Sequence, residues 1–150
     1  MAFEIKEYEE QYYKEVVDIF DKTFGIAEKE TKNYIAFTLG KEGAKFWVVV
    51  EENKVLGLLQ FSYEAWNKVG NIGMIGTTPD AKGKGIGKAL MNQAEKYAKE
   101  VGVRKIYVDT AADNPGAQIF YIKMGYFPEY SMKDYYEPGL HGINFSKYIK

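Results

Sequence analysis

The sequence predicts a single α/β domain over residues 1–150, with a mixed central sheet of about six to seven strands and helices on both faces. Segments with apolar residues at helical spacing are interleaved with short β-branched and aromatic runs, and this alternation is typical of α/β folds. The chain of 150 residues, with 46% hydrophobic and 27% charged residues, suits one soluble domain with one core.

The first half of the chain predicts two helices and a hairpin. Apolar residues recur at helical spacing from residue 10, and Gly40 is expected to end the second helix. Two apolar runs flank the polar turn 51–54, as in a β-hairpin. Glycines inside the next run indicate a bulge or a close approach of the backbone. The expected elements are a strand at 2–8, helices at 10–20 and 28–39, and strands at 45–50, 55–63 and 71–78.

The second half repeats the alternation of helix and strand. An amphipathic helix is expected to end at Gly102. Asn114 followed by Pro115 predicts the start of a shorter helix, because Asn caps helices and Pro suits their first position. The stretch 138–142, which contains Pro and two glycines, predicts a loop. The expected elements are helices at 88–101 and 114–124, and strands at 103–110, 126–132 and 142–149.

Composition excludes several classes of site. The chain has no cysteine, which excludes a disulfide framework, a thiolate nucleophile and a zinc–cysteine site. With His141 as the single histidine, no metal site is expected. The net charge of −1 argues against a general nucleic-acid partner. The acidic start lacks the apolar segment of a signal peptide, and no apolar run is long enough for a membrane span, so we expect a cytoplasmic protein without a membrane partner.

The stretch PDAKGKGIGKAL, residues 79–90, predicts an anion site. Gly83, Gly85 and Gly87 occupy every second position just before a helix. A helix start carries N–H groups without intrahelical partners and a partial positive charge, which together favour a phosphate. The neighbouring lysines Lys82, Lys84 and Lys88 add positive charge. The alternative is a flexible turn with solvated lysines.

Two common phosphate motifs do not fit this loop. A Walker A loop requires Ser or Thr after the lysine, where this chain has Ala89 after Lys88. A dinucleotide fingerprint requires the spacing Gly-x-Gly-x-x-Gly, whereas the spacing here is Gly-x-Gly-x-Gly. Basic glycine loops also occur in nucleic-acid modules, but no basic surroundings support that function here.

Two stretches together resemble the GNAT superfamily of N-acetyltransferases. IGTTPDAKGKGIGKAL resembles the acyl-coenzyme A loop, Gln/Arg-x-x-Gly-x-Gly/Ala, with Lys82 at the Gln/Arg position. IYVDTAADNPGAQIFYIKMGYFPEY, residues 106–130, resembles the second motif of the family. The residues in register with that motif are Asn114, Ala117, Tyr121, Gly125 and Tyr126. The resemblance covers roughly residues 46–149 and is weak over the first 45 residues.

The resemblance implies the GNAT fold, acetyl-coenzyme A (acetyl-CoA) as cofactor, and acetyl transfer to a primary amine by direct attack in a ternary complex. Asn114 is then expected to contact the pantetheine arm. A backbone N–H near the end of strand 71–78 is expected to polarise the thioester carbonyl; we expect Thr77, with an uncertainty of one residue. The implied cofactor-binding residues are Thr77, Thr78, Lys82, Gly83, Lys84, Gly85, Ile86, Gly87, Lys88, Asn114, Ala117 and Tyr121.

Tyr121 is implied as the general acid. A thiol has a reference pKa of about 8.5 and a phenol of about 10, so a phenol can protonate a departing thiolate and still be protonated at neutral pH. The structural alternative for Tyr121 is a helix tyrosine packed on the sheet.

Asp109 is a candidate general base, because it stands near the end of an otherwise apolar strand. It precedes Tyr121 by twelve residues, which is similar to the Glu and Tyr pair of the ribosomal-protein alanine N-acetyltransferase branch. That branch also carries a Tyr-Tyr pair, as Tyr135-Tyr136 here. Asp in place of Glu and the loop 138–142 depart from it. Glu64 is the rival base, a water relay could serve either, and a structural carboxylate is the alternative for Asp109.

The acceptor stays open between a small-molecule amine and a protein or peptide amine. A homodimer through an exposed sheet edge is also left open. Two other functions compete with the transferase: an acyl-CoA sensor without turnover, and a nucleotide- or RNA-binding module built on the lysine–glycine loop.

Overall fold

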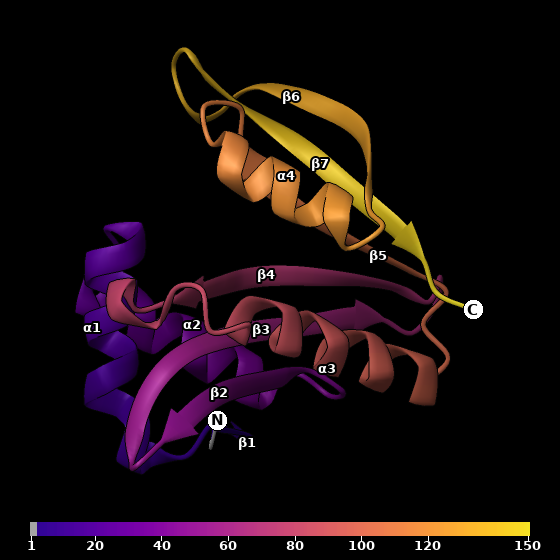
Figure 1. The fold of residues 1–150 in the computed structure, drawn as a ribbon. Coiled ribbons are helices and arrows are strands. Elements are labelled where there is room, and N and C mark those ends of the chain that lie inside the picture. The colour runs from indigo at the N-terminus through magenta and orange to yellow at the C-terminus, as the bar shows by residue number, and fades with distance from the viewer. Residues whose placement is uncertain (1–2) are drawn as a thin grey trace. The chain divides into compact units, whose positions relative to one another are not determined.

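The computed structural model describes residues 3–150 and shows seven strands and four α-helices there (Figure 1). In chain order they are β1 (Glu4–Glu7), α1 (Tyr13–Phe24), α2 (Glu28–Gly40), β2 (Lys45–Glu51), β3 (Lys54–Glu64), β4 (Val69–Thr77), α3 (Ile86–Glu100), β5 (Lys105–Ala111), α4 (Pro115–Lys123), β6 (Phe127–Glu137) and β7 (Leu140–Tyr148). Single 3-10 turns, η1 (Glu10–Tyr12) and η2 (Pro79–Ala81), precede α1 and α3.

The strands form one mixed sheet in the order β1-β2-β3-β4-β5-β7-β6. β4 and β5 pair in parallel, whereas β1–β2, β2–β3, β5–β7 and β6–β7 are antiparallel. The predicted α/β class with a mixed sheet of six to seven strands is therefore confirmed. The chain divides into two compact units. The first unit is the described part of Met1–Ser62 together with Met74–Ala94, and the second unit is Tyr63–Gly73 together with Glu95–Lys150.

One local expectation was confirmed and one was wrong. α2 ends at Gly40 as expected, and the extended residue Lys41 follows it. The last loop is shorter than expected, because Pro138 and Gly139 alone make the turn, with Gly139 in the left-handed region (φ +88°). His141 consequently lies inside β7, where its Nδ1 accepts a hydrogen bond from the Asp134 amide (2.9 Å).

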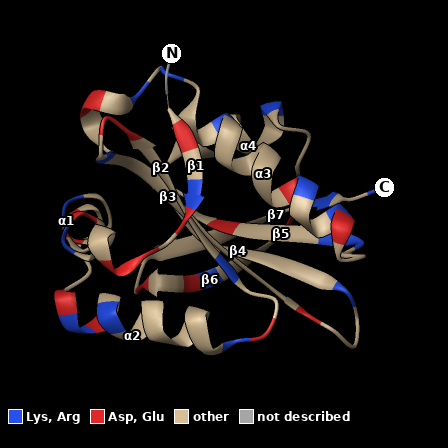
Figure 2. Cartoon of the chain, turned by 90° about the horizontal axis from the view of Figure 1, so that it is seen from below, with Lys and Arg blue, Asp and Glu red and all other residues tan. Residues whose placement is uncertain are grey.

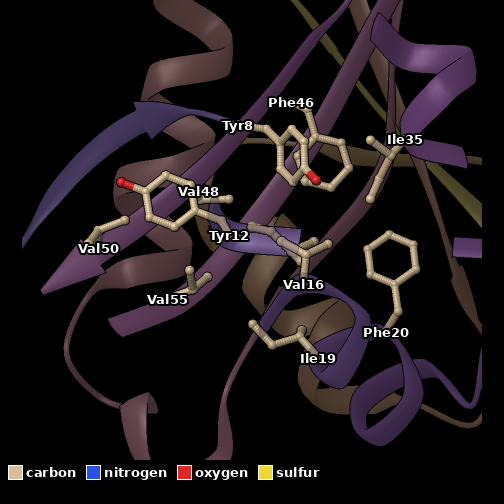
Figure 3. Packing of buried hydrophobic residues seen from close by; sticks show 11 residues of the cluster. Tyr8, Tyr12, Val16, Ile19, Phe20, Ile35, Phe46, Val48, Val50 and Val55 are labelled. Atoms are coloured by element: carbon tan, nitrogen blue, oxygen red, sulfur yellow. The ribbon is translucent and has the colours of Figure 1, made fainter. Parts of the chain in front are cut away.

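The core of the first unit lies between α1, α2 and the inner face of β2 and β3. The apolar stripe of α1 supplies Val16 and Phe20, both fully buried. Phe46 of β2 and Ile35 of α2 meet this stripe (Figure 3). The Phe20 ring lies 5.8 Å from the Tyr34 ring and 6.3 Å from the Phe46 ring. Helical spacing along α1 and alternation along β2 thus direct the apolar side chains of both elements into one cluster.

Two strand glycines show that helices cover both faces of the sheet in the first unit. Leu58 packs into the cluster under α1 and α2, so its neighbour Gly57 faces the other side. A Cβ atom on Gly57 would lie 2.9 Å from the Ile86 side chain of α3 and 3.0 Å from the Gly76 carbonyl oxygen. A Cβ on Gly76 would lie 2.6 Å from the Phe24 ring of α1. The close approach expected from the β4 glycines is thus present at Gly76.

The second unit carries one apolar and one polar sheet face. Ile106 and Val108 of β5 are buried, and Phe145 of β7 packs against Tyr121 of α4 with ring centroids 5.8 Å apart. Because side chains alternate along a strand, the residues between them face the other way. That opposite face carries Asp109 and Tyr107 of β5, paired in register with Asn144 and Ser146 of β7.

The terminal strands of the sheet differ in length and regularity. β1 has only four residues, three of them charged. β6 has eleven residues, all exposed, and its pairing with β7 shifts register between Pro128 and Tyr130 and again between Met132 and Glu137. Asp134, inside the second shift, has a positive φ of 55°.

Charged residues of both signs are interspersed over the helices. Blue and red segments follow one another at the start of α2 (Figure 2), in agreement with the net charge of −1. Within residues 3–150, no helix combines the length and apolar character needed to cross a membrane.

Candidate active site

The glycine loop leads from η2 into α3 and is anchored at both ends. Ala81 and Ile86 are buried, whereas the four residues between them are exposed. Gly83 and Gly85 have φ values of +82° and +77°, and a Cβ on either would meet no atom within 4 Å. Torsion, not lack of space, therefore requires glycine at these two positions.

The start of α3 offers donors to an anion. The Gly85 carbonyl accepts the Ala89 amide (3.0 Å), so Gly85 is the residue before the first helical turn. The amides of Ile86, Gly87 and Lys88 lie in the first turn of α3, where no carbonyl of the helix can accept a hydrogen bond from them. The positive end of a 15-residue helix adds to the charge of the loop lysines. The open backbone and these donors fit the diphosphate of a coenzyme.

The backbone amides at the end of β4 are the expected donors to the thioester carbonyl, and one of them is already hydrogen-bonded within the protein. The Thr78 amide donates to the Leu56 carbonyl (2.9 Å), and the Thr78 hydroxyl is 3.5 Å from the same oxygen. The Thr78 amide is therefore engaged within the first unit. Thr77 is the last residue of β4 and is half-buried, and it stays the predicted donor.

Asn114 begins α4 as the sequence predicts. Its Oδ1 accepts a hydrogen bond from the Ala117 amide (3.1 Å), and Pro115 takes the first helical position. The cap uses the oxygen of the Asn114 side chain, so its Nδ2 group is the part that suits a ligand carbonyl. The cap fixes the first turn of the helix that carries Tyr121.

Tyr121 is buried in the second unit, with a 4% exposed side chain. Its ring lies 5.8 Å from the Phe145 ring and 6.1 Å from the Tyr126 ring. Burial raises the pKa of the Tyr121 phenol well above its usual value, and the charges of Tyr136 and Asp109 raise that pKa further. Tyr121 therefore holds its proton at neutral pH and can act as an acid.

Asp109 is half-buried among phenols. Burial raises the pKa of its carboxyl, while a hydrogen bond from Asn144 Nδ2 to Asp109 Oδ1 (3.3 Å) works in the opposite direction. Asp109 in turn contributes to raising the pKa values of Tyr107, Tyr130 and Tyr136, the last to about 12. Burial is the larger cause in all three. A carboxylate with a raised pKa is a stronger base than an exposed one.

Glu64, the rival base, ends β3 and is exposed. Its charge is the smallest of the contributions that raise the pKa of Tyr107. The structure brings Asp109 into electrostatic contact with Tyr121.

Sequence reasoning missed Asn144, Tyr107 and Tyr130 as neighbours of Asp109. The available signal was polar residues at alternate positions in the run GINFSKYI, since Asn144 and Ser146 flank the buried Phe145. Such alternation indicates a polar face on a strand interior. It does not indicate which strand that face adjoins.

The sequence of the chain is similar to those of known proteins. Residues 7–126 match the family model described as the Acetyltransferase (GNAT) family. An uncharacterized N-acetyltransferase of Methanocaldococcus jannaschii is 30% identical over 112 residues, which are 71% of this chain and 50% of that protein. The streptothricin acetyltransferase of Streptomyces lavendulae is 32% identical over 95 residues, 58% of this chain and 50% of that protein. The chain spans about half the length of these curated relatives.

A solved structure confirms the fold. The ribosomal-protein alanine N-acetyltransferase of Escherichia coli matches with a TM-score of 0.85 at 18% identity, over 99% of this chain and 95% of that one. At this identity the similarity shows the fold alone. The matched structure is of a protein from the branch that the Asp109–Tyr121 spacing resembles.

Proposed function

Because the chain belongs to the GNAT acetyltransferase family, we propose that it transfers an acetyl group from acetyl-CoA to a primary amine by direct attack. The observation that carries this proposal is that the buried, protonated Tyr121 and the half-buried Asp109 interact electrostatically within the second unit. The acceptor is a small-molecule amine or an amine of a protein or peptide; the streptothricin acetyltransferase relative is named for the former and the E. coli structure for the latter.

Acetyl-CoA supplies the activated acetyl thioester. In the first unit, the amides of Ile86, Gly87 and Lys88 and the open backbone at Gly83 and Gly85 would hold its diphosphate. Lys82 and Lys84, exposed in the same loop, add charge. The Thr77 amide donates to the thioester carbonyl oxygen, where negative charge develops during attack. In the second unit, Asn114 Nδ2 donates to the pantetheine arm beside Ala117.

Two titratable side chains of the second unit, Asp109 and Tyr121, would move the protons. A free aliphatic amine is protonated at neutral pH and must lose a proton before it attacks. Asp109 accepts that proton, directly or through one water. The Tyr121 hydroxyl would donate its proton to the sulfur as the C–S bond breaks, because the phenol is still protonated when the thiolate forms. The second proton of the attacking nitrogen, which is released as the amide forms, would restore the Tyr121 phenol.

A thermal-shift titration tests the cofactor. At 100 times its dissociation constant, a ligand adds about 2.7 kcal/mol to the free energy of unfolding, which shifts the midpoint of a domain of this size by about 5–10 °C. We expect this shift with acetyl-CoA and with free coenzyme A. ATP and NAD are the matched controls and are expected to give none.

The other outcomes are equally informative. A shift with ATP or RNA oligomers and none with coenzyme A would point to the nucleotide- or RNA-binding function. No shift with millimolar acetyl-CoA would contradict the assignment of the glycine loop. A positive result leads to a screen of amine acceptors, with free thiol release as the readout.

A further inference from the structure

A row of polar side chains crosses three strands of the second unit on the face that carries Asp109. Asn144 of β7 is in register with Asp109 of β5 on one side and with Tyr130 of β6 on the other. Ser146 follows two residues later on the same face, opposite Tyr107. Asn144 and Ser146 are 2% and 0% exposed. Buried polar side chains of this kind are costly unless they are hydrogen-bonded.

The hydrogen bonds define the direction of the Asn144 amide. Its Nδ2 lies 3.3 Å from Asp109 Oδ1, and its Oδ1 lies 3.1 Å from Ser146 Oγ. The Ser146 hydroxyl is also 2.6 Å from an oxygen of Glu129, which pairs with Lys105 Nζ at 2.9 Å. Ser146 has one proton and can donate it to one of the two oxygens at a time. The contact with the Glu129 carboxylate is the shorter and charge-assisted one, and it lowers the pKa of Glu129, so the proton goes chiefly to Glu129. The orientation in which Asn144 Nδ2 faces Asp109 is therefore favoured by the Asp109 carboxylate itself.

We propose that Asn144 is the positioning residue that keeps the Asp109 carboxylate charged and directed for removal of the acceptor proton. This inference rests on the proposed function for its catalytic half. The coupling between Asn144 and Asp109 is a property of the free protein and can be measured without either substrate.

The surroundings of Asp109 explain why a neutral donor matters. Phenols from three elements interact with the charge of its carboxylate: Tyr107 on β5, Tyr130 and Tyr136 on β6, and Tyr121 on α4, whose ring packs on Phe145 at the opposite face of the sheet. Among the described groups whose charges interact with Asp109, none is a cation. The Lys105 ammonium on the same strand is paired with Glu129.

A neutral amide suits a general base better than a cation would. A lysine or arginine beside Asp109 would hold the carboxylate charged but would lower its pKa and weaken it as a base. Burial alone would raise the pKa toward the protonated form. The Asn144 amide donates to the charged form and opposes that rise, so the carboxylate is held toward its charged form while burial keeps it basic.

A titration of the Asp109 carboxyl carbon by NMR tests the coupling in the full chain, without acetyl-CoA or acceptor. Asn144→Leu removes the donor, and Ser146→Ala removes the hydroxyl that contacts Asn144 Oδ1 (3.1 Å); the Asp109→Asn variant assigns the signal. We expect the pKa of Asp109 to rise by about one unit in Asn144→Leu, the size of one hydrogen bond to a charged group. A smaller rise is expected in Ser146→Ala. An unchanged pKa in both variants would overturn the proposal.

Lys147→Met is the matched control, because Lys147 lies on the opposite face of β7 and pairs with Glu95 (2.9 Å). It perturbs the same strand but is expected to leave the Asp109 titration unchanged. If Asn144→Leu does not fold, Ser146→Ala carries the test. A shift of equal size in Lys147→Met would show a general disturbance of β7 and would overturn the specific role of Asn144.

The rate profile tests the catalytic half. With acetyl-CoA and an acceptor, the acid limb of kcat/KM should move to higher pH by the same amount as the Asp109 pKa in each variant. A limb that stays in place while the NMR titration moves would overturn the positioning role. If the wild-type chain acetylates no amine, the proposed function fails, and the NMR titration still decides whether Asn144 controls Asp109.

Discussion

The carboxyl of Asp109 and the phenol of Tyr121 have raised pKa values for the same main reason, which is burial of the charged form. The raised pKa has opposite consequences for the functions of these two groups. A raised pKa keeps Tyr121 protonated and available as an acid over the whole physiological range. It makes Asp109 a better base but moves its protonation to higher pH, so acetyl transfer should fall as pH drops through a value above that of an exposed aspartate.

Replacement of the Tyr121 hydroxyl should separate catalysis from cofactor binding. We expect Tyr121→Phe to lower kcat by about 10²–10⁴-fold, the usual range for loss of a general acid, while the thermal shift with acetyl-CoA is retained. Tyr148→Phe is the matched control, since Tyr148 is exposed in the same unit, and its kcat should equal that of the wild type. Equal rates in Tyr121→Phe and wild type would remove Tyr121 from the mechanism.

Asp109 and Tyr121 could be predicted from the sequence because both lie in one continuous motif. Asn144 could not, although it is in contact with Asp109. It is 35 residues away, and its partner depends on which strand β7 joins and in which register. A shift of one residue would turn Asn144 to the apolar face and Phe145 to Asp109.

At the scale of elements, the glycines divide by physical cause. Gly83 and Gly85 are required by a left-handed φ in open space, whereas Gly57 and Gly76 are required by close neighbours. The alternating pattern in the loop was readable from sequence, because three glycines before a helix indicate a special backbone. For Gly76 the sequence indicated only a close approach of the backbone. It could not identify Phe24 as the neighbour, because that contact depends on how α1 packs on the sheet.

Gly85→Ala should weaken cofactor binding beyond its effect on stability. Forcing a non-glycine residue into the left-handed region costs about 1–2 kcal/mol. Gly102→Ala is the matched control: Gly102 also has a left-handed φ (+82°) and open space around it, but it follows the end of α3. We expect similar losses of unfolding free energy in both variants by urea titration. Only Gly85→Ala should also lower acetyl-CoA affinity; equal affinities would contradict the role of the loop.

At the scale of the whole molecule, stability depends on the aromatic core of the first unit. Phe20→Ala should lower the free energy of unfolding by about 3–5 kcal/mol, because Phe20 is fully buried and its loss leaves a cavity. Phe37→Ala, on the 61% exposed Phe37 of α2, should change it by less than about 0.5 kcal/mol. Urea denaturation measures both, and a small loss in Phe20→Ala would mean that this cluster is not a principal source of stability.

The fold class followed from the order of elements, but the order of strands did not. β7 lies between β5 and β6, so the last two strands in the chain exchange the places that simple succession would give them. Only in that position does β7 place Asn144 between Asp109 of β5 and Tyr130 of β6 on the polar face. On the apolar face, Phe145 then packs against Tyr121. Such long-range agreement is not contained in any local window of the sequence.

The two terminal strands also bear on self-association. Edge strands expose unpaired backbone groups and invite strand addition, which leads to aggregation. β1 limits this by having only four residues, with Glu4, Lys6 and Glu7 among them. β6 is long and carries exposed aromatic side chains, but its two register shifts and the positive φ of Asp134 interrupt the straight ladder that another chain would need. A continuous intermolecular sheet along the full length of β6 is therefore disfavoured, and the aromatic surface there can stay accessible at high protein concentration without seeding fibres.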